Sequence, residues 1–587
     1  MLLQRLNDYA DRLDLPPTLY VEAPVRYVID LHGSGRLLNP RPIDTADPSD
    51  PRTRRGERRL VPQVQRASGI RPLLLADNVE YTLGLPRETS KPERVAACHA
   101  AYRDLVGRCA ARSREPSVEA VCAFLDGDPT SQLDLPEDFD RGATTTFRVD
   151  GVFPIDLPGV QSFWAAENDP SLKDARVMQC LICGQERPVL ERLQAKIKGV
   201  PGGQTSGTSI ISANAEAFES YGLEASFIAP TCASCGERFT KAANELLANQ
   251  QSRMVLGGAA FIFWTREEVG FDLRSFMTDP KPEQVRDLLE SVRTGKPVSR
   301  VDNTAFYATT LSGSGGRTVV RDWIDTTVGN ACEQLSRWFE RQWIVDAYGD
   351  EPRPLGLYAL AAATVRDAQK ELAPPTPRAL IRAALIGTPL PLSLLHQAVN
   401  RNRAERDVMR PRAALIKLVL LSQHTDIPKE DRMVRLDPDN PSSAYQCGRL
   451  LAVLEEVQRR AVPGIKQTIV DRFFGTASSA PASVFGRLVR GAQPHLAKLE
   501  RDQHGAYVAL QRRLEDVQAN LSSYPRILKL EDQGLFALGY YHQRAYDRAQ
   551  AREASERRKA GLTLPTDDML TDDEMEVRQS ELEKESN

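Results

Sequence analysis

The chain of 587 residues is 41% hydrophobic and 26% charged, an ordinary globular composition, and it exceeds the size at which a single core stops growing. The formal net charge of −3 excludes a uniformly basic chain, and the longest strongly apolar stretch, residues 254–264, is far too short to span a bilayer. Nine cysteines without a visible secretory segment argue against a disulfide framework, so we expect a cytoplasmic protein of at least two domains.

The N-terminal part begins with signals for one helix and a pair of strands. Residues 1–14 read as an amphipathic helix, and residues 20–38 mix β-branched and aromatic residues around Gly33 and Gly35, the pattern of a hairpin. The segment 39–59 is rich in Pro, Asp and Arg and has no apolar period. It predicts a flexible loop.

Arginines gather at the end of that loop and just after it, at Arg52, Arg54, Arg55, Arg58, Arg59 and Arg66. Such a run is typical of a solvated face, but mobile arginines also suit contacts to phosphate groups. Both interpretations stay open, and these residues are candidates for contacting a nucleic-acid backbone.

Strand and helix signals alternate over the rest of the N-terminal part. The predicted helices lie at 91–125, 213–221, 238–248 and 279–292. The predicted strands lie at 144–152, 254–264, 304–313 and 317–323, the last two paired across the turn SGSGG. Together they predict a mixed sheet covered by helices, in an N-terminal α/β domain of residues 1–370.

Two Cys-x-x-Cys pairs stand out at residues 180–235. Cys180, Cys183, Cys232 and Cys235 can surround a tetrahedral Zn²⁺, and a glycine follows the second cysteine of each pair. Four thiolates leave no open coordination position, so we expect structural zinc in a knuckle insertion rather than catalysis. Reduced buried cysteines and redox chemistry are the alternatives.

Between the knuckles runs a glycine-rich basic loop, residues 196–209. Glycine permits close approach of backbone, and amide, hydroxyl and ammonium groups can bind phosphates and the acceptors of a DNA minor groove. Its candidate DNA-binding residues are Lys196, Lys198, Gly199, Gly202, Gly203, Gln204, Thr205 and Ser206. Two other segments supply further candidates, namely Ser68, Arg71, Asn78, Arg317 and Arg321. The competing interpretation is a surface loop whose glycines only make turns.

Strand signals disappear beyond Pro374, Pro375 and Pro377, and four amphipathic helical segments follow at 450–457, 485–499, 507–521 and 532–551. They predict a C-terminal helical bundle within residues 371–566, so the fold class is α+β. Basic residues predicted on the bundle surface are Arg449, Lys466, Arg472, Arg487, Arg490, Arg512 and Arg513. Such residues solvate a helix or line a path for a nucleic-acid strand.

The last segment, residues 567–587, carries nine Asp and Glu against Arg578 and Lys584, a net charge of −7 that leaves the rest of the chain at +4. It predicts an acidic disordered tail, with a regulatory role as the alternative.

No phosphate-binding Walker loop, GxSxG elbow or HExxH motif is present in the sequence. We therefore expect a protein that is not an enzyme. A zinc-assisted nuclease would need a carboxylate or histidine cluster beside the thiols.

One run, KIKGVPGGQTSGTSIISANAEAFESYG at residues 196–222, resembles the large subunit of type I-C CRISPR interference (Cascade) complexes. Further blocks agree in order, among them RASGIRPLLLADNVEYTLG, LSGSGGRTVVRDW, RPRAALIKLVLL, AYQCGRLLAVLEEVQ and LEDQGLFALGYYHQR. They span nearly the whole chain.

The resemblance implies a non-catalytic subunit that recognises the protospacer-adjacent motif (PAM) in duplex DNA and promotes unwinding and R-loop formation. The implied partners are crRNA, target duplex and displaced strand, the Cascade backbone, crRNA-end and small subunits, and the helicase-nuclease. The bundle resembles the small subunit, and the family's genes often also yield that subunit separately; Met433 is the candidate internal start for it here, with Met409 as a less well placed alternative. The alternative function is a zinc-ribbon RNA-binding or scaffold protein outside CRISPR systems.

Overall fold

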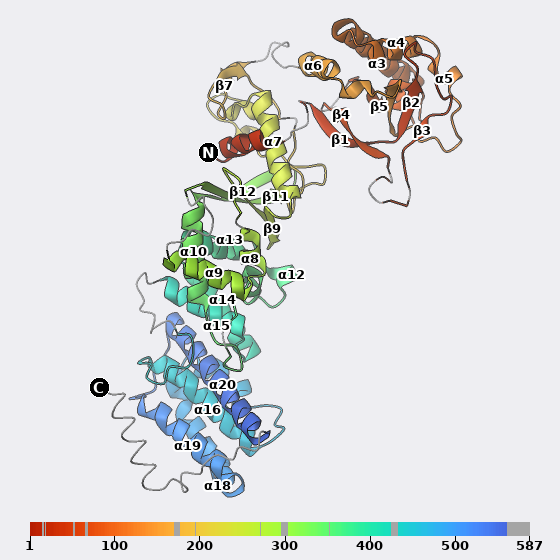
Figure 1. Ribbon diagram of the computed structural model, residues 1–587. Coiled ribbons are helices and arrows are strands. Elements are labelled where there is room, and N and C mark those ends of the chain that lie inside the picture. The colour runs from red at the N-terminus through yellow and green to blue at the C-terminus, as the bar shows by residue number, and fades with distance from the viewer. Residues whose placement is uncertain are drawn as a thin grey trace. The chain divides into compact units, whose positions relative to one another are not determined.

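The computed structural model describes residues 1–559, apart from residues 14–16, 18, 48, 51–52, 54, 65–68, 88, 169–175, 194, 271, 295–302, 351–352 and 424–432. The chain divides into two compact units, the first made of residues 1–250 and 311–321 and the second of residues 251–310 and 322 onward (Figure 1). The expected boundary between residues 370 and 371 thus falls inside the second unit. The predicted acidic tail lies outside the described residues.

A mixed four-stranded sheet forms one core of the first unit, in the order β3-β2-β6-β5. Its central strands, β2 (Tyr27–Leu31) and β6 (Thr144–Val149), are parallel, and β3 (Ile43–Asp44) and β5 (Ala76–Asn78) pair antiparallel at the two edges. The helices of this part are α2 (Val79–Thr82), α3 (Pro92–Ser113), α4 (Pro116–Asp126), α5 (Pro129–Gln132) and α6 (Pro158–Glu167).

Sequence patterns explain how these helices begin and what they bury. Proline stands in the first turn of α3, α4 and α6, where its missing N–H costs nothing. Their apolar stripes bury Val106, Phe124 and Trp164 together with Phe147 of the sheet. The predicted helix at 91–125 and strand at 144–152 are confirmed, with a break in the helix at Arg114, which adopts a left-handed conformation.

Two predictions for the N-terminal segment need correction. β1 (Tyr20–Val25) pairs with β4 (Glu57–Pro62) rather than with β2, so the turn at Gly33 and Gly35 closes only a single Leu31 to Leu37 bridge. The segment 39–59 is not loop throughout, because it contains β3 and the start of β4. Local alternation predicts strands, but it does not tell which strands pair.

The knuckle region belongs to the same unit. A short ribbon of β7 (Val177–Gln179) and β8 (Glu186–Pro188) leads to α7 (Ala233–Ala248), against which the N-terminal helix α1 (Leu2–Tyr9) packs. The Arg238 guanidinium of α7 donates to the Asn7 carbonyl oxygen at 3.0 Å. The helix predicted at 213–221 is wrong, since only a 3-10 turn at Glu216–Phe218 forms there.

A four-stranded sheet in the order β12-β11-β10-β9 follows. The stretch predicted as one strand at 254–264 is a hairpin, β9 (Arg253–Leu256) and β10 (Ala259–Thr265), because Gly257 and Gly258 both take positive φ at its turn. The hairpin of β11 (Ala305–Ser314) and β12 (Arg317–Thr327) is as predicted. Its tip, residues 311–321, is part of the first unit.

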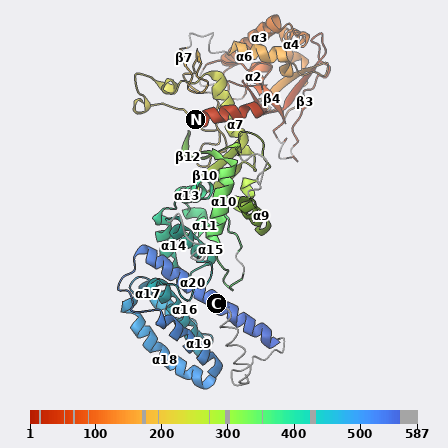
Figure 2. The same cartoon turned by 60° about the vertical axis from the view of Figure 1, so that its left-hand side comes forward.

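Helices make up the described remainder of the second unit, as predicted from residue 371 onward (Figures 1 and 2). They are α8 (Leu273–Thr278), α9 (Pro282–Thr294), α10 (Val328–Gln342), α11 (Leu357–Ala362), α12 (Ala368–Glu371), α13 (Pro375–Ile386), α14 (Leu392–Glu405), α15 (Arg410–Ser422), α16 (Ser443–Ala461), α17 (Ile469–Ala477), α18 (Phe485–Asp502), α19 (His504–Ala519) and α20 (Leu530–Lys559). In the described part of the chain, no helix combines the length and apolarity that crossing a membrane requires.

The four predicted bundle helices correspond to α16, α18, α19 and α20. Helix α16 is buried on nearly every side, and it packs against each of the other three (Figure 2). It buries charged as well as apolar side chains: Glu455 accepts hydrogen bonds from Arg459, Thr468 and Tyr540 at 2.6 to 3.1 Å. The apolar core of the bundle therefore encloses a small polar network centred on Glu455.

Candidate nucleic-acid interface and metal centre

The glycine-rich loop and the tip of the β11–β12 hairpin meet in the first unit. The loop runs beside the hairpin in parallel bridges, Gly203 to Gly315 and Ser209 to Arg317. Backbone bonds join them: the Ser209 N–H donates to the Gly316 carbonyl at 2.8 Å, and the Thr318 N–H donates to the Ser209 carbonyl at 2.9 Å. Two of the three predicted candidate segments thus form one surface, which we call the loop–hairpin surface.

Glycines are required where the two segments touch. A Cβ added to Gly313 would lie 2.1 Å from the Gly203 nitrogen, and one added to Gly203 would lie 2.5 Å from the Thr208 side chain. Gly202 and Gly207 take φ of +76° and +104°. These four glycines therefore serve the packing and turns of the loop itself, so their presence is explained without a ligand.

The outer rim of this surface presents polar groups to solvent. Gln204, Thr205, Ser206 and Ser314 are exposed, while the Gln204 N–H is satisfied by the Gly315 carbonyl at 3.2 Å. Behind them, the hydroxyls of Thr208 and Thr318 share a buried hydrogen bond of 2.6 Å. A backbone that is hydrogen-bonded to the hairpin thus carries an outward set of amide and hydroxyl side chains.

The lysines of the loop have different roles. The Lys196 ammonium donates to the Ser209 hydroxyl at 2.7 Å, so it is engaged within the loop. Lys198 is exposed, beside Gly199, which has open space around it. Of the two, Lys198 is the cation placed to meet an anionic ligand.

The two predicted arginines of the hairpin are partly engaged. The Arg317 guanidinium donates to the Asn214 side chain and lies 3.9 Å from the centre of the Phe218 ring. Arg321 is exposed and donates from Nε to the Ser312 hydroxyl at 2.8 Å. Both remain at the edge of the loop–hairpin surface.

Helix α7 holds the loop by a residue that the sequence did not single out. The Asn244 side chain accepts from the Lys198 N–H at 2.7 Å and donates to the Lys196 carbonyl at 3.0 Å. An asparagine inside a helix is a poor helix former, which is the signal that could have marked it. Asn244 connects the loop to the helix that begins at the second cysteine pair.

The four predicted cysteines come together. Their Sγ atoms lie within 4.8 Å of one another, and the Cys232 N–H donates to the Cys180 sulfur at 3.4 Å. Tetrahedral Zn–S bonds of about 2.3 Å place sulfurs roughly 3.8 Å apart, so the donor set fits a zinc ion. Cys183 lies at the exposed edge and the other three are buried.

The surroundings of these thiols affect their ionisation in different directions. Burial raises the pKa of Cys232 and of Cys235. Burial also opposes ionisation of Cys180, but backbone N–H groups of Cys183, Cys232 and Ile182 outweigh it and lower its pKa to about 7. Four thiolates in so small a space repel one another, and a divalent cation removes that repulsion.

The remaining candidates in the N-terminal segment are spread over other elements. Ser68, Arg66, Arg52 and Arg54 lie outside the described residues, and Arg55 and Arg71 are exposed. The Asn78 side chain caps α2 by accepting from the Glu80 N–H at 3.1 Å.

The prediction of a mobile loop is wrong for Arg58 and Arg59, because both lie on β4. Arg58 pairs with Glu22, and Arg59 pairs with Asp156 and stacks on Phe153. These pairings leave less of their charge for a phosphate.

On the bundle, the predicted surface position is wrong for Arg449. It is only 4% exposed, because it lies on the side of α16 that meets α20, and donates to the Gln543 side chain and to the Pro438 carbonyl. Arg513 is half-buried against Asp547. The other predicted residues are exposed, namely Lys466, Arg472, Arg487, Arg490 and Arg512.

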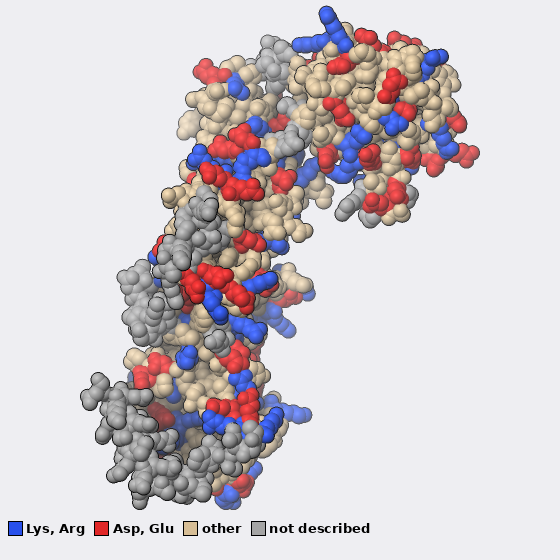
Figure 3. All heavy atoms as spheres, in the orientation of Figure 1, with Lys and Arg blue, Asp and Glu red and all other residues tan. Residues whose placement is uncertain are grey.

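Charge alone does not single out a candidate surface on the face drawn in Figure 3. On the face drawn in Figure 3, Lys and Arg side chains are interspersed with Asp and Glu.

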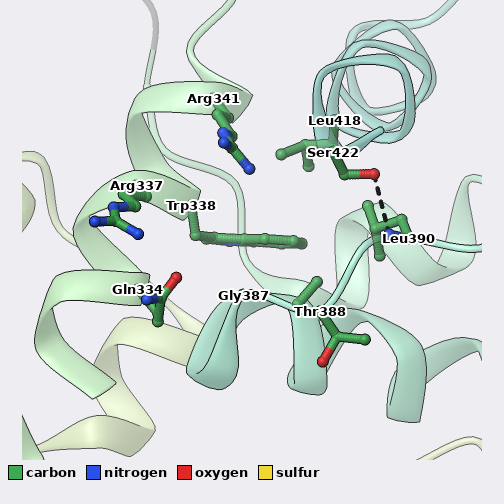
Figure 4. Close-up of a pocket in the computed structure, with 10 residues that line it drawn as sticks. Gln334, Arg337, Trp338, Arg341, Gly387, Thr388, Leu390, Leu418 and Ser422 are labelled. Carbon is green, nitrogen blue, oxygen red and sulfur yellow. Dashed lines mark hydrogen bonds between the residues drawn. The ribbon is translucent and has the colours of Figure 1, made fainter. Parts of the chain in front are cut away.

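One pocket lies in the second unit, between α10, α13 and α15. In Figure 4 the Trp338 ring lies across it, with Arg341 on one side, and the Ser422 hydroxyl accepts from the Leu390 N–H at 3.0 Å. Its cavity of about 20 Å³ has room for one water molecule, which is too small for a nucleotide or a small organic substrate.

Comparison with protein families gives a match over residues 3–546 to the family described as CRISPR-associated protein (Cas_Csd1). A search of curated proteins finds no match. The family match covers both units and supports the CRISPR interpretation over a zinc-ribbon protein outside CRISPR systems. The chain therefore belongs to the Csd1 family of CRISPR-associated proteins, the large subunits of type I-C complexes that are guided by crRNA.

Proposed function

We propose that this subunit recognises the PAM in intact duplex DNA through the loop–hairpin surface. The observation that carries the proposal is the docking of the loop on the hairpin tip, which presents Gln204, Thr205, Ser206 and Ser314 together. Reading a base pair without opening the duplex needs donors at fixed positions. The side chains of the loop can supply these donors, because the backbone that carries them is hydrogen-bonded within the protein.

The chemistry suits the minor groove. The Gln204 amide can donate to the N3 and O2 acceptors there, a partly degenerate readout that suits a motif of two or three base pairs. The Lys198 ammonium suits a flanking phosphate, a contact that adds affinity without sequence information. Gln204 is thus assigned to specificity, and Lys198 to binding strength.

The role after recognition is binding without covalent chemistry. Local unwinding starts guide pairing, an exchange so nearly balanced that protein contacts to the backbone and to the displaced strand decide its direction. The exposed residues Arg472, Arg487 and Arg490 of α17 and α18 are assigned to the displaced strand. The partners are the backbone, crRNA-end and small subunits, and the helicase-nuclease docks on this subunit.

Binding of the crRNA complex, prepared with and without this subunit, to guide-matched duplexes that carry or lack the PAM tests the role. Salt is held fixed, because phosphate contacts change with ionic strength. We expect preference for the PAM to disappear when the subunit is omitted. Equal preference in both preparations would refute the proposal, and DNA cleavage by the purified subunit alone with Mg²⁺ would refute its non-catalytic role.

We also propose that Cys180, Cys183, Cys232 and Cys235 hold a structural zinc ion. The support is the clustering of four thiols, within 4.8 Å of one another, from two chain segments 52 residues apart. Elemental analysis should find about one zinc per chain, lost in Cys232→Ser and retained in Cys122→Ser, whose half-buried thiol lies outside the cluster. A zinc-free protein whose thermal unfolding does not change with a chelator would contradict the site.

A further inference from the structure

A projecting turn in the first unit carries the most exposed large hydrophobic side chain among the described residues. Tyr221 is 98% exposed and Phe218, three residues earlier, is 47% exposed. An isolated exposed aromatic needs no explanation, but two on one short projection, one of them fully outside, mark a contact surface. We call residues 214–224 the aromatic tip.

The turn fixes Tyr221 where it stands. Tyr221 and Gly222 take φ of +54° and +68°, and the Leu223 N–H donates to the Ser220 carbonyl at 2.9 Å. Both central residues are left-handed, a conformation that glycine adopts freely and tyrosine does not. Glycine would suit this position better for folding alone, so the backbone conformation does not explain why a tyrosine stands here.

The base of the tip is anchored to the body of the unit. The Arg317 guanidinium covers one face of the Phe218 ring, 3.9 Å from its centre, and bonds to Asn214. On the other side, the Ser226 N–H donates to the Glu191 carbonyl at 3.0 Å. The tip is therefore a pre-organised projection, which reduces the entropy lost on binding.

Charge identifies the class of partner. Glu216, Glu219 and Glu224 lie on the tip, and residues 213–225 contain no Lys or Arg. The Glu219 carboxylate also accepts from the Ala225 N–H at 3.3 Å, which holds it in place. Three carboxylates around an aromatic ring repel phosphates and attract a face rich in Lys and Arg.

We infer that the aromatic tip docks on a cationic face of another protein subunit, with Tyr221 inserted as the central contact. Subunits that hold RNA carry such faces, so the partner belongs to the crRNA-bearing complex. The inference rests on the proposed function only in that choice of partner. Tyrosine is enriched at interface hot spots because it combines a large apolar ring with a hydroxyl.

The test measures how tightly the subunit binds a crRNA complex assembled without it, in the absence of target DNA. Tyr221→Ala should weaken this binding by about tenfold or more. Tyr358→Ala, at a tyrosine that is 52% exposed in the second unit, is the matched control and should change binding by less than about twofold. Replacing Glu216 and Glu224 by Lys should slow association, most strongly at low salt.

Two outcomes would overturn the inference. One is a Tyr221→Ala subunit that binds the complex as the wild type does. The other is a Tyr221→Ala subunit that loses affinity equally for naked crRNA or duplex DNA, which would make the tip a nucleic-acid contact. If the wild-type complex prefers duplexes with the PAM and the Tyr221→Ala subunit assembles normally, only the assignment of the tip fails. If the wild-type complex shows no preference for the PAM, the proposed function fails instead.

Discussion

The loop–hairpin surface of the first unit and the interior of the helical bundle in the second unit use polar residues in opposite ways. In the loop, backbone groups bond to each other and the side chains of Gln204 and Ser206 point to solvent. In the bundle, Glu455 and Arg449 are buried and saturated by protein partners. The comparison teaches that a polar residue indicates a ligand site only where the fold leaves its hydrogen-bonding capacity unused.

The largest effect should come from the bundle. Glu455→Ala leaves Arg459, Tyr540 and Thr468 without their shared buried acceptor, and we expect the free energy of unfolding to fall by about 3–5 kcal/mol. Glu456→Ala is the control, because Glu456 makes the same pairing with Arg460 four residues later but its side chain is 29% exposed, against 3% for Glu455. Its expected cost is below about 0.5 kcal/mol. Equal losses of unfolding free energy for the two variants in denaturant titrations would show that the buried hydrogen bonds of Glu455 add no stability.

The second effect concerns the contact between loop and hairpin. Gly313→Ala places a methyl group 2.1 Å from the Gly203 nitrogen, so one backbone must move, at a cost of about 3 kcal/mol or less. PAM preference should fall as well. Gly316→Ala is the control, since its added Cβ has the Gln204 side chain 3.6 Å away as its nearest neighbour. Thermal unfolding of the two variants gives the comparison, and equal stability would refute the close approach.

A third effect depends on pH and belongs to the bundle. Burial, with the nearby charge of Lys417, lowers the pKa of His542 to about 3. A histidine with a depressed folded pKa binds protons more readily when unfolded, so stability is lost as the pH falls below about 6.5. Between pH 6.5 and 5 this residue should cost about 1.6 kcal/mol.

His542→Gln isolates that contribution, because other groups titrate equally in both proteins. The free energy of unfolding of the variant should depend less on pH over this range than that of the wild type. Parallel curves would mean that the Tyr445 hydroxyl, 2.9 Å from Nδ1, does not hold a neutral ring.

The smallest effect tests how α7 positions the loop. Asn244→Ala removes two bonds to the loop backbone and should cost about 1–2 kcal/mol, with a partial loss of PAM preference at unchanged zinc content. Glu245→Ala, at the exposed neighbouring residue, should change neither the stability nor the PAM preference. Loss of zinc in Asn244→Ala would show a general disruption of the unit instead.

Much of the fold could be predicted because periodicity is local. Leu450, Val453 and Val457 recur at helical spacing, and all three are buried in α16. Arg449, next to that stripe, could not be placed, because only the position of α20 decides whether a neighbour of the stripe is covered. The prediction of one strand at 254–264 is wrong for a local reason, because Gly257 and Gly258 form a turn that divides it into a hairpin.

The sequence predicted which residues belong to the candidate site, but not how they are arranged in space. The clustering of the four cysteines could be predicted from their spacing, because two Cys-x-x-Cys pairs are a pattern typical of a metal site. Nothing local tells that Gly203 meets Gly313, 110 residues away, although glycines in both segments are compatible with it. Asn244 was not predicted for the same reason, because its hydrogen bonds also join segments that are distant in sequence.

The most direct test of the loop–hairpin assignment is the ratio of dissociation constants for duplexes lacking and carrying the PAM, measured with the complete complex at fixed salt. Gln204→Ala should lower that ratio by about tenfold, while Lys198→Ala should weaken both duplexes alike and reduce the salt dependence of binding. Gln63→Ala, at an exposed glutamine elsewhere in the first unit, should leave the ratio unchanged. An unchanged ratio in Gln204→Ala, with zinc content and assembly intact, would contradict the assignment.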